Sequence, residues 1–192
     1  TANITALNIG VSDTFTQTGT GVLNASTTID TSGTLTLLNQ GTGTIDGVDT
    51  GRGDLVFSGS YNTDSAIGAT KSLASITVNA GQTLTLVEDA DATTFTNNGT
   101  VNQSANTLTV TTLNIGANDT YNLSGTGDIS STTTNVGANA TVTQSGSGDF
   151  NSTTTNIATG ATYTQTAGTG ALNSTNIVLG SGSTLTLRNQ GM

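Results

Sequence analysis

Three consecutive copies of one pattern decide the fold: LNIGANDTYNLSGTGDIS (113–130), NVGANATVTQSGSGDFN (135–151) and NIATGATYTQTAGTGALN (156–173). Aligned with one another, they bring apolar residues into register at three positions. These positions are Ile115, Val136 and Ile157, then Tyr121, Val142 and Tyr163, and then Ile129, Phe150 and Leu172. Successive members of each set lie 21 or 22 residues apart. A fixed period of about this size is typical of a solenoid.

Alternation within one copy predicts how a unit folds. In the segment 140–144, Thr141 and Thr143 flank Val142, so a strand here buries the valine and exposes both threonines. Two further short strands, around Val136 and Phe150, are separated from it by Gly, Asn and Ser. We therefore expect three-sided coils that stack about 4.8 Å apart and share parallel strand ladders and one narrow core.

The strand around Val142 recurs along the whole chain. Its nine segments are TFTQ (14–17), TLTL (34–37), DLVF (54–57), TLTL (83–86), TVNQ (100–103), TYNL (120–123), TVTQ (141–144), TYTQ (162–165) and TLTL (184–187), with expected buried centres at Phe15, Leu35, Leu55, Leu84, Val101, Tyr121, Val142, Tyr163 and Leu185. The sequence thus predicts an all-β parallel β-helix with three strands per coil and about nine coils of 20–22 residues. We align the nine strands in a single stack and interpret the long interval between Leu55 and Leu84 as a loop.

The domain organisation is simple. We expect one solenoid over residues 1–192, with an irregular insertion at about 58–75 and no shift in composition that marks a boundary. The segment LTLRNQGM (185–192) copies LTLLNQGTG (35–43). The sequence is therefore expected to be one segment or subunit of a longer array, whose partner is itself or its neighbouring repeats.

Asparagine also recurs, at Asn8, Asn114, Asn135, Asn156 and Asn176. Amides that stack on successive coils form hydrogen-bonded ladders. Asparagine is also favoured in turns whatever its neighbours. Both interpretations of this pattern stay open.

Composition excludes several functions. The chain holds 12 Asp and Glu against three Lys and Arg, a net charge of −9. Three cations cannot neutralise a run of phosphates, so we expect no nucleic acid as partner, and no basic patch favours an anionic membrane. No stretch approaches the roughly 20 apolar residues of a membrane helix. Because Cys and His are absent, there are no thiol nucleophiles and no imidazole bases, and we expect no enzyme.

The segment 46–54 carries two candidate motifs. Some parallel β-helices act on polysaccharides with clustered Asp and a cationic residue, and Asp46, Asp49, Arg52 and Asp54 form such a cluster. A solvated acidic loop explains the cluster better, so no catalytic residues are expected. Arg52, Gly53 and Asp54 also spell the tripeptide that integrins recognise. The alignment places Asp54 at the start of a flat strand, which is an unusual position for such a motif.

Calcium is the one cofactor that the sequence leaves open. Glu88, Asp89 and Asp91 lie together in an acidic corner, and Asp128 and Asp149 follow equivalent glycines. Their oxygens are of the kind that Ca²⁺ prefers. The calcium-binding nonapeptide of RTX proteins does not recur in this chain, so the expected metal site and cofactor are none, with Glu88, Asp89 and Asp91 as candidates.

Outward threonines form the candidate binding surface. They are Thr14, Thr16, Thr34, Thr36, Thr83, Thr85, Thr141, Thr143, Thr162, Thr164, Thr184 and Thr186. In a single stack they make a Thr-x-Thr array, which resembles the ice-binding face of β-solenoid antifreeze proteins. Threonine is favoured on any β-surface, however, so a purely structural interpretation competes with binding of ice, a glycan or a receptor.

A family resemblance rests on phrases such as FTNNGTVNQSANTLTV (95–110) and on corners such as GTGDIS (125–130). These resemble the repeat region of large secreted bacterial surface proteins, including autotransporter passengers and filamentous-haemagglutinin-like adhesins. The resemblance implies a right-handed parallel β-helix and an extracellular or cell-surface location. It also implies a structural or adhesive role as stalk, adhesin or filament material that stacks end to end, with a host receptor or glycan as alternative partner.

Overall fold

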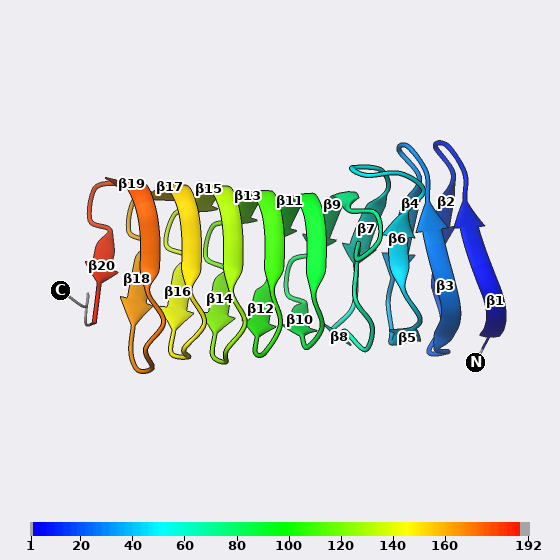
Figure 1. The fold of residues 1–192 in the computed structure, drawn as a ribbon, viewed down its shortest axis with the longest axis horizontal. Helices are drawn as coiled ribbons and strands as arrows, with labels where there is room; N and C mark the ends of the chain where they lie inside the picture. The colour runs from blue at the N-terminus through cyan, green and yellow to red at the C-terminus, as the bar shows by residue number, and fades with distance from the viewer. Residues whose placement is uncertain (1, 189–192) are drawn as a thin grey trace.

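The computed structural model describes residues 2–188, which form a parallel β-solenoid of about nine turns (Figure 1). The described termini lie at opposite ends of the rod. All strand pairs in it are parallel, in three sheets that form the three sides of the coil. The predicted fold class is therefore confirmed, and the right-handed sense of the coil stays a prediction.

One sheet runs along the whole rod. This nine-stranded sheet contains β2 (Thr14–Thr16), β4 (Thr34–Leu37), β7 (Asp54–Phe57), β9 (Leu73–Val78), β11 (Ala90–Asn97), β13 (Leu108–Ile115), β15 (Ile129–Val136), β17 (Phe150–Ile157) and β19 (Leu172–Leu179). The strands follow one another in chain order without a crossover, because each coil stacks only on its neighbours.

The other two sides each cover part of the rod. The seven-stranded sheet contains β8 (Tyr61–Asn62), β10 (Thr83–Leu86), β12 (Thr100–Gln103), β14 (Thr120–Leu123), β16 (Thr141–Gln144), β18 (Thr162–Gln165) and β20 (Thr184–Thr186). The four-stranded sheet contains β1 (Ala2–Ile9), β3 (Leu23–Ile29), β5 (Gly41–Thr42) and β6 (Ile45–Gly47). Single bridges from Ile45 to Ile67 and from Ile67 to Ala90 carry the third side on into the first half of β11.

Inward side chains form one continuous core. On the nine-stranded sheet Leu35, Leu55, Ile76, Phe95 and Leu113 stack in one column, and none of them is exposed. Burial of each such side chain stabilises the fold by about 1.5–3 kcal/mol. Seven of the nine expected centres are buried, and the other two are only partly buried because each lies on a terminal coil with one neighbour. The partly buried centres are Phe15 and Leu185.

The single stack of nine Thr-x-Thr strands is wrong. Strand β7 pairs with β9, with Leu55 opposite Ile76, and β10 pairs with β8, with Leu84 opposite Tyr61. The segments before residue 58 therefore lie on the nine-stranded sheet, and those from residue 83 onward lie on the seven-stranded sheet. The same sequence pattern occupies two different sides of the coil.

The 29-residue interval between Leu55 and Leu84 spans more than one turn. One turn ends at Ile76, 21 residues after Leu55 and on the same sheet. The chain then needs one further side to reach Leu84. Within the segment 58–75 lie β8, the bridging residue Ile67 and the first residues of β9, so each side of this coil is occupied, partly by strands too short to show alternation.

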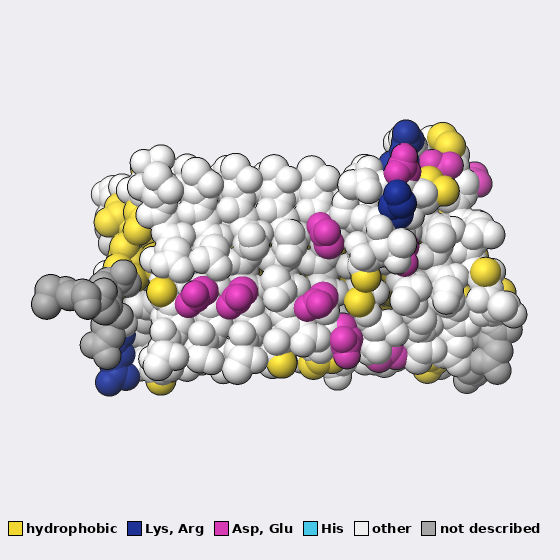
Figure 2. All heavy atoms as spheres, in the orientation of Figure 1, with side chains coloured by type: hydrophobic (Ala, Val, Ile, Leu, Met, Phe, Trp, Pro, Cys, Tyr) yellow, Lys and Arg dark blue, Asp and Glu magenta, His cyan; other side chains and the backbone are white. Residues whose placement is uncertain are grey.

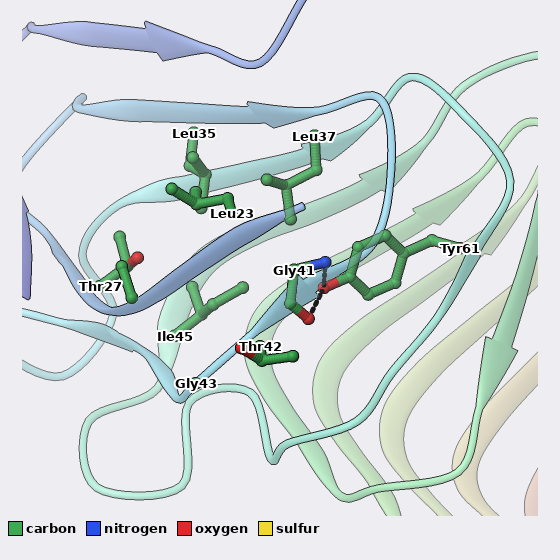
Figure 3. Close-up of a pocket in the computed structure, with 10 residues that line it drawn as sticks. Leu23, Thr27, Leu35, Leu37, Gly41, Thr42, Gly43, Ile45 and Tyr61 are labelled. Carbon is green, nitrogen blue, oxygen red and sulfur yellow. Dashed lines mark hydrogen bonds between the residues drawn. The ribbon is translucent and has the colours of Figure 1, made fainter. Parts of the chain in front are cut away.

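Tyr61 fills the interior where the pattern changes sides (Figure 3). Its hydroxyl accepts a hydrogen bond from Gly41 N at 2.9 Å and donates one to Gly41 O at 2.7 Å. A Cβ on Gly41 would lie 3.0 Å from Leu23 O and 3.1 Å from Tyr61 Oη, so glycine leaves the ring its space. The remaining cavity, of about 10 Å³, has room for about one water molecule.

Asn97 explains the shortest interval, the 17 residues between Leu84 and Val101. It occupies an inward position, opposite Val78, and is fully buried. Its Nδ2 donates to Thr120 O at 2.8 Å, and its Oδ1 accepts from Gly99 N at 2.9 Å. The amide thus satisfies backbone groups at a corner with too few residues to do so alone.

Candidate functional site

The structure divides the predicted threonine surface between two sheets. Thr14, Thr16, Thr34 and Thr36 lie on the nine-stranded sheet, and the remaining predicted residues lie on the seven-stranded sheet. These remaining residues are Thr83, Thr85, Thr141, Thr143, Thr162, Thr164, Thr184 and Thr186. They face outward in two arrays, and their part in binding stays a prediction.

The nine-stranded sheet carries a further threonine column that the sequence interpretation missed. Thr94, Thr112, Thr133 and Thr154 lie opposite one another on successive coils and are half-buried. The signal was present in the repeated Thr pairs that precede the buried centre of β11 to β17. Threonine therefore covers two sides of the rod, which is what its preference for outward β positions produces.

An asparagine ladder runs along the nine-stranded sheet. Asn135 Nδ2 donates to Asn114 Oδ1 at 2.8 Å, and Asn156 Nδ2 donates to Asn135 Oδ1 at 2.8 Å. The expected ladder is confirmed for these three residues. Asn8 lies opposite Thr28 and Asn176 lies opposite Thr154, so the other two belong to different columns.

Glutamines and tyrosines form a buried polar network behind the seven-stranded sheet. Tyr121 Oη donates to Gln103 Oε1, and Tyr163 Oη donates to Gln144 Oε1, both at 2.6 Å. Gln144 Nε2 donates to Gly148 O at 2.8 Å, which ties the glycine corner to the sheet. Burial raises the pKa of both tyrosines. Because every polar group here has a partner, the network fixes one arrangement of the coils.

The acidic corner at residues 88–91 uses its carboxylates within the fold. Asp89 Oδ1 accepts from Thr107 N at 2.8 Å, and Glu88 Oε2 accepts from Asn106 Nδ2 at 3.2 Å. Desolvation raises the pKa of Asp91. Over residues 2–188, no group of three His, Cys, Asp or Glu side chains is placed to hold a metal ion.

Asp128 and Asp149 play one structural part on successive coils. Asp128 Oδ1 accepts from Asp149 N at 2.7 Å, and Asp149 Oδ1 accepts from Ala171 N at 2.8 Å. Each carboxylate therefore satisfies a backbone N–H of the coil above it. Charge-assisted bonds of this kind are stronger than neutral ones.

The motif Arg52-Gly53-Asp54 lies at a corner of the coil. Gly53 is buried, with a φ of 83°, and a Cβ there would lie 2.4 Å from the Cβ of Ile29. Asp54 begins β7, and its Oδ1 accepts from Ser75 Oγ at 2.5 Å. The exposed Arg52 donates to Thr31 Oγ1. The tripeptide therefore lies along the coil with its aspartate hydrogen-bonded, and recognition by an integrin stays untested.

The candidate catalytic cluster has separate partners for its other members. Asp46 Oδ1 accepts from Thr70 N at 2.9 Å. Asp49 lies 3.5 Å from Lys71 Nζ, and a hydrogen bond from Thr50 N together with the charge of Lys71 lowers its pKa. Charged side chains gather on the projection over the N-terminal half in Figure 2. Through these contacts the carboxylates of Asp46 and Asp49 hold the backbone and side chains of the long corner in place.

The two ends of the rod differ from its sides. The C-terminal coil exposes Ile177, Val178, Leu179 and Leu187 by 37%, 56%, 52% and 38%. Figure 2 shows the hydrophobic side chains gathered at this end. The N-terminal coil instead forms a hollow of about 260 Å³, which is lined by Leu7, Asn8, Ile9, Asp13, Thr14 and Phe15. Core side chains thus reach the surface at both ends.

The comparisons with known proteins identify no relative, so the chain is identified by its fold alone. No family model, no curated protein and no solved structure matches the chain. The described part of the β-solenoid holds no helix that is long and apolar enough to cross a membrane.

We expect the solenoid to become more stable as the pH falls from 7 towards about 4. Desolvation raises the pKa of Asp64, Asp91 and Asp119, so the folded state binds protons before the unfolded state does. The net charge of −9 also shrinks, which reduces repulsion. Asp49 acts in the opposite sense, but only as the pH falls below its ordinary value of 3.8. The check is the thermal midpoint at each pH, and a midpoint that falls over this range would contradict the expectation.

Proposed function

We propose that this chain forms a non-enzymatic structural rod at the extracellular surface of a bacterium, where it holds other parts at a fixed distance. One observation carries the proposal. The nine-stranded sheet continues in register from β2 to β19, with every coil hydrogen-bonded to the next. Such a ladder bends little, and its length depends only on the number of coils.

Two features of the sequence support the proposed location. The repeats resemble those of secreted bacterial adhesins, and the chain contains no Cys that would need a disulfide-forming environment during export. The polar surface of Thr, Ser, Asn and Gly suits a rod that faces water along its whole length. The alternative function is binding of a glycan, a host receptor or ice through the outward threonines. Their presence on both sheets favours the structural role, because the preference of threonine for outward β positions produces it without any ligand.

A distance measurement tests the spacer. Nitroxide labels at Thr34→Cys and Thr154→Cys lie in one outward column, six coil spacings apart. We expect a narrow distribution of electron spin distances around about 29 Å. The native chain has no cysteine that would take up label elsewhere. A broad distribution, or one centred far from this value, would contradict a rigid spacer.

Removal of residues 108–128 is expected to shorten the rod by one coil and leave it folded. Leu108 lies opposite Ile129 and Val101 is one coil from Tyr121, so the deletion brings β11 onto β15 and β12 onto β16 in register. Gln103 then meets Gln144, as Gln144 already meets Gln165 at 3.0 Å.

The label distance in this variant should fall by about 4.8 Å. The matched control removes residues 108–121 only, which displaces every later strand to another side of the coil. We expect the control to lose cooperative unfolding in circular dichroism. If both deletions unfolded cooperatively and gave the same label distance, the register between coils would not be what keeps the rod folded.

A further inference from the structure

We propose that copies of this chain stack head to tail, with the C-terminal coil of one copy on the N-terminal coil of the next. The proposal rests on the structural function above and names its partner, a second copy of this chain. Four observations support it: exposed core residues at one end, a hollow at the other, matching columns, and parallel strand direction.

The C-terminal end presents side chains that belong to the core. Ile177 lies opposite Thr155, and Leu179 lies opposite Ile157, both of which are buried one coil below. Ile177 and Leu179 therefore point inward but are 37% and 52% exposed, because nothing in residues 2–188 lies above them. A further coil that covered these exposed apolar groups would lower the free energy by removing them from water.

The N-terminal end offers the complementary shape. Leu7 and Phe15 are partly buried core residues at the hollow of about 260 Å³. The exposed apolar residues at the end of one copy thus meet a hollow on another whose lining includes Leu7, Ile9 and Phe15. Backbone groups match on the nine-stranded sheet as well, because its two edge strands, β2 and β19, each keep one unpaired side.

The columns of the core agree at both ends. Successive pairings place Phe15 and Ile177 at the two ends of one inward column, which runs through Leu35, Leu55 and Ile76. A second copy placed on β19 in the same register therefore sets its Phe15 over Ile177. Head-to-tail stacking continues the ladder of the nine-stranded sheet without a change in strand direction.

Strand direction selects head-to-tail stacking. All strand pairs of the rod are parallel, and a joint between two C-terminal ends would instead place β19 antiparallel to its copy. Because the joint is heterologous and does not close, it generates filaments.

Sedimentation velocity and electron microscopy of the purified chain over a wide concentration range test the proposal. We expect mass to increase with concentration, and filaments with an axial repeat of about 43 Å, nine coil spacings. The Ile177→Asp variant should remain monomeric. The control is Val87→Asp, the same kind of change at a valine that is 39% exposed in the middle of the rod, and it should assemble like the native chain. A chain that stays monomeric at all concentrations overturns the proposal, as does equal assembly of Ile177→Asp.

Mixing determines the orientation. The Phe15→Asp variant keeps an intact C-terminal end, and Ile177→Asp keeps an intact N-terminal end. Each alone should be a monomer, and an equimolar mixture should give dimers of one copy of each. Dimers of Phe15→Asp alone would show joints between two C-terminal ends and overturn the head-to-tail arrangement. If circular dichroism shows that Phe15→Asp is unfolded, Leu7→Asp replaces it. The spin-label distances within one copy test the rigid spacer and do not depend on stacking. A failure of the stacking proposal can therefore be told apart from a failure of the proposed spacer function.

Discussion

The Gly146→Ala variant is expected to unfold with a free energy about 3 kcal/mol lower than that of the native chain. A Cβ at this position would lie 2.0 Å from Gly125 O and 2.6 Å from Gly125 N, in the coil below. These are backbone atoms, which cannot rotate away. Separation of the two corners would stretch the bonds from Ser147 N and Gly148 N to Gly125 O, now 2.9 Å and 3.0 Å. Thermal unfolding should show a midpoint lower by about 6–12 °C.

The matched control is Gly19→Ala. Gly19 is exposed, and the nearest atom to its Cβ would be Gly21 N at 3.9 Å. Its free energy of unfolding should change by less than about 0.5 kcal/mol. An equal loss in both variants would contradict the role of close stacking, because Gly19 has no close neighbour, and the effect of alanine on the unfolded chain alone would raise the stability.

The strand pattern could be predicted from the sequence because inward and outward residues alternate in almost every long strand. Val142, Tyr121 and Leu35 are buried as their positions predict. The side of the coil on which a strand lies could not be predicted in the same way. Alternation specifies which face of a strand is buried, and it is identical for TLTL at 34–37 and at 83–86.

The change of side depends on elements without a sequence signal. Strand β8 has two residues and Ile67 makes a single bridge, too short for a period of two to be recognised. The hydrogen bonds between Tyr61 and Gly41 join residues 20 apart, and only the stacked coils bring them together. A tyrosine and a glycine one coil apart are compatible with many other arrangements.

The candidate surfaces were partly accessible to sequence reasoning. The Asn114, Asn135 and Asn156 ladder follows from residues at a constant interval. The burial of Gln103 and Gln144 also follows from their position two residues after a buried centre, but their polarity suggests an outward position. The exposed apolar end at Ile177 could not be predicted, because the same alternation describes a covered and an uncovered coil.

A steep loss of stability above about pH 10 is the second large effect that we expect. Burial raises the pKa of Tyr61 to about 12 and also raises the pKa of Tyr121 and Tyr163. Unfolded tyrosines ionise near pH 10, so between these values the folded state holds more protons than the unfolded state. The free energy of unfolding then falls by up to about 1.4 kcal/mol per pH unit for each tyrosine, which makes about 4 kcal/mol per pH unit for all three. Urea unfolding at a series of pH values, together with tyrosinate absorbance, measures this slope.

The glutamine network gives the alkaline transition its specific control. A tyrosinate at Tyr163 would face Gln144 Oε1, and the amide cannot simply turn round because its Nε2 holds the carbonyl of Gly148. The double variant Tyr121→Phe with Tyr163→Phe removes both ionisable groups and leaves Tyr61. It should be less stable at neutral pH, because Gln103 Oε1 loses the hydrogen bond that Tyr121 donates. Gln144 Oε1 loses the one from Tyr163 and keeps only the one from Gln165. Its slope above about pH 10 should nevertheless fall to about one third. An unchanged slope would place the alkaline sensitivity outside these two tyrosines, and would mean that the interior of the seven-stranded sheet admits water before the rod unfolds.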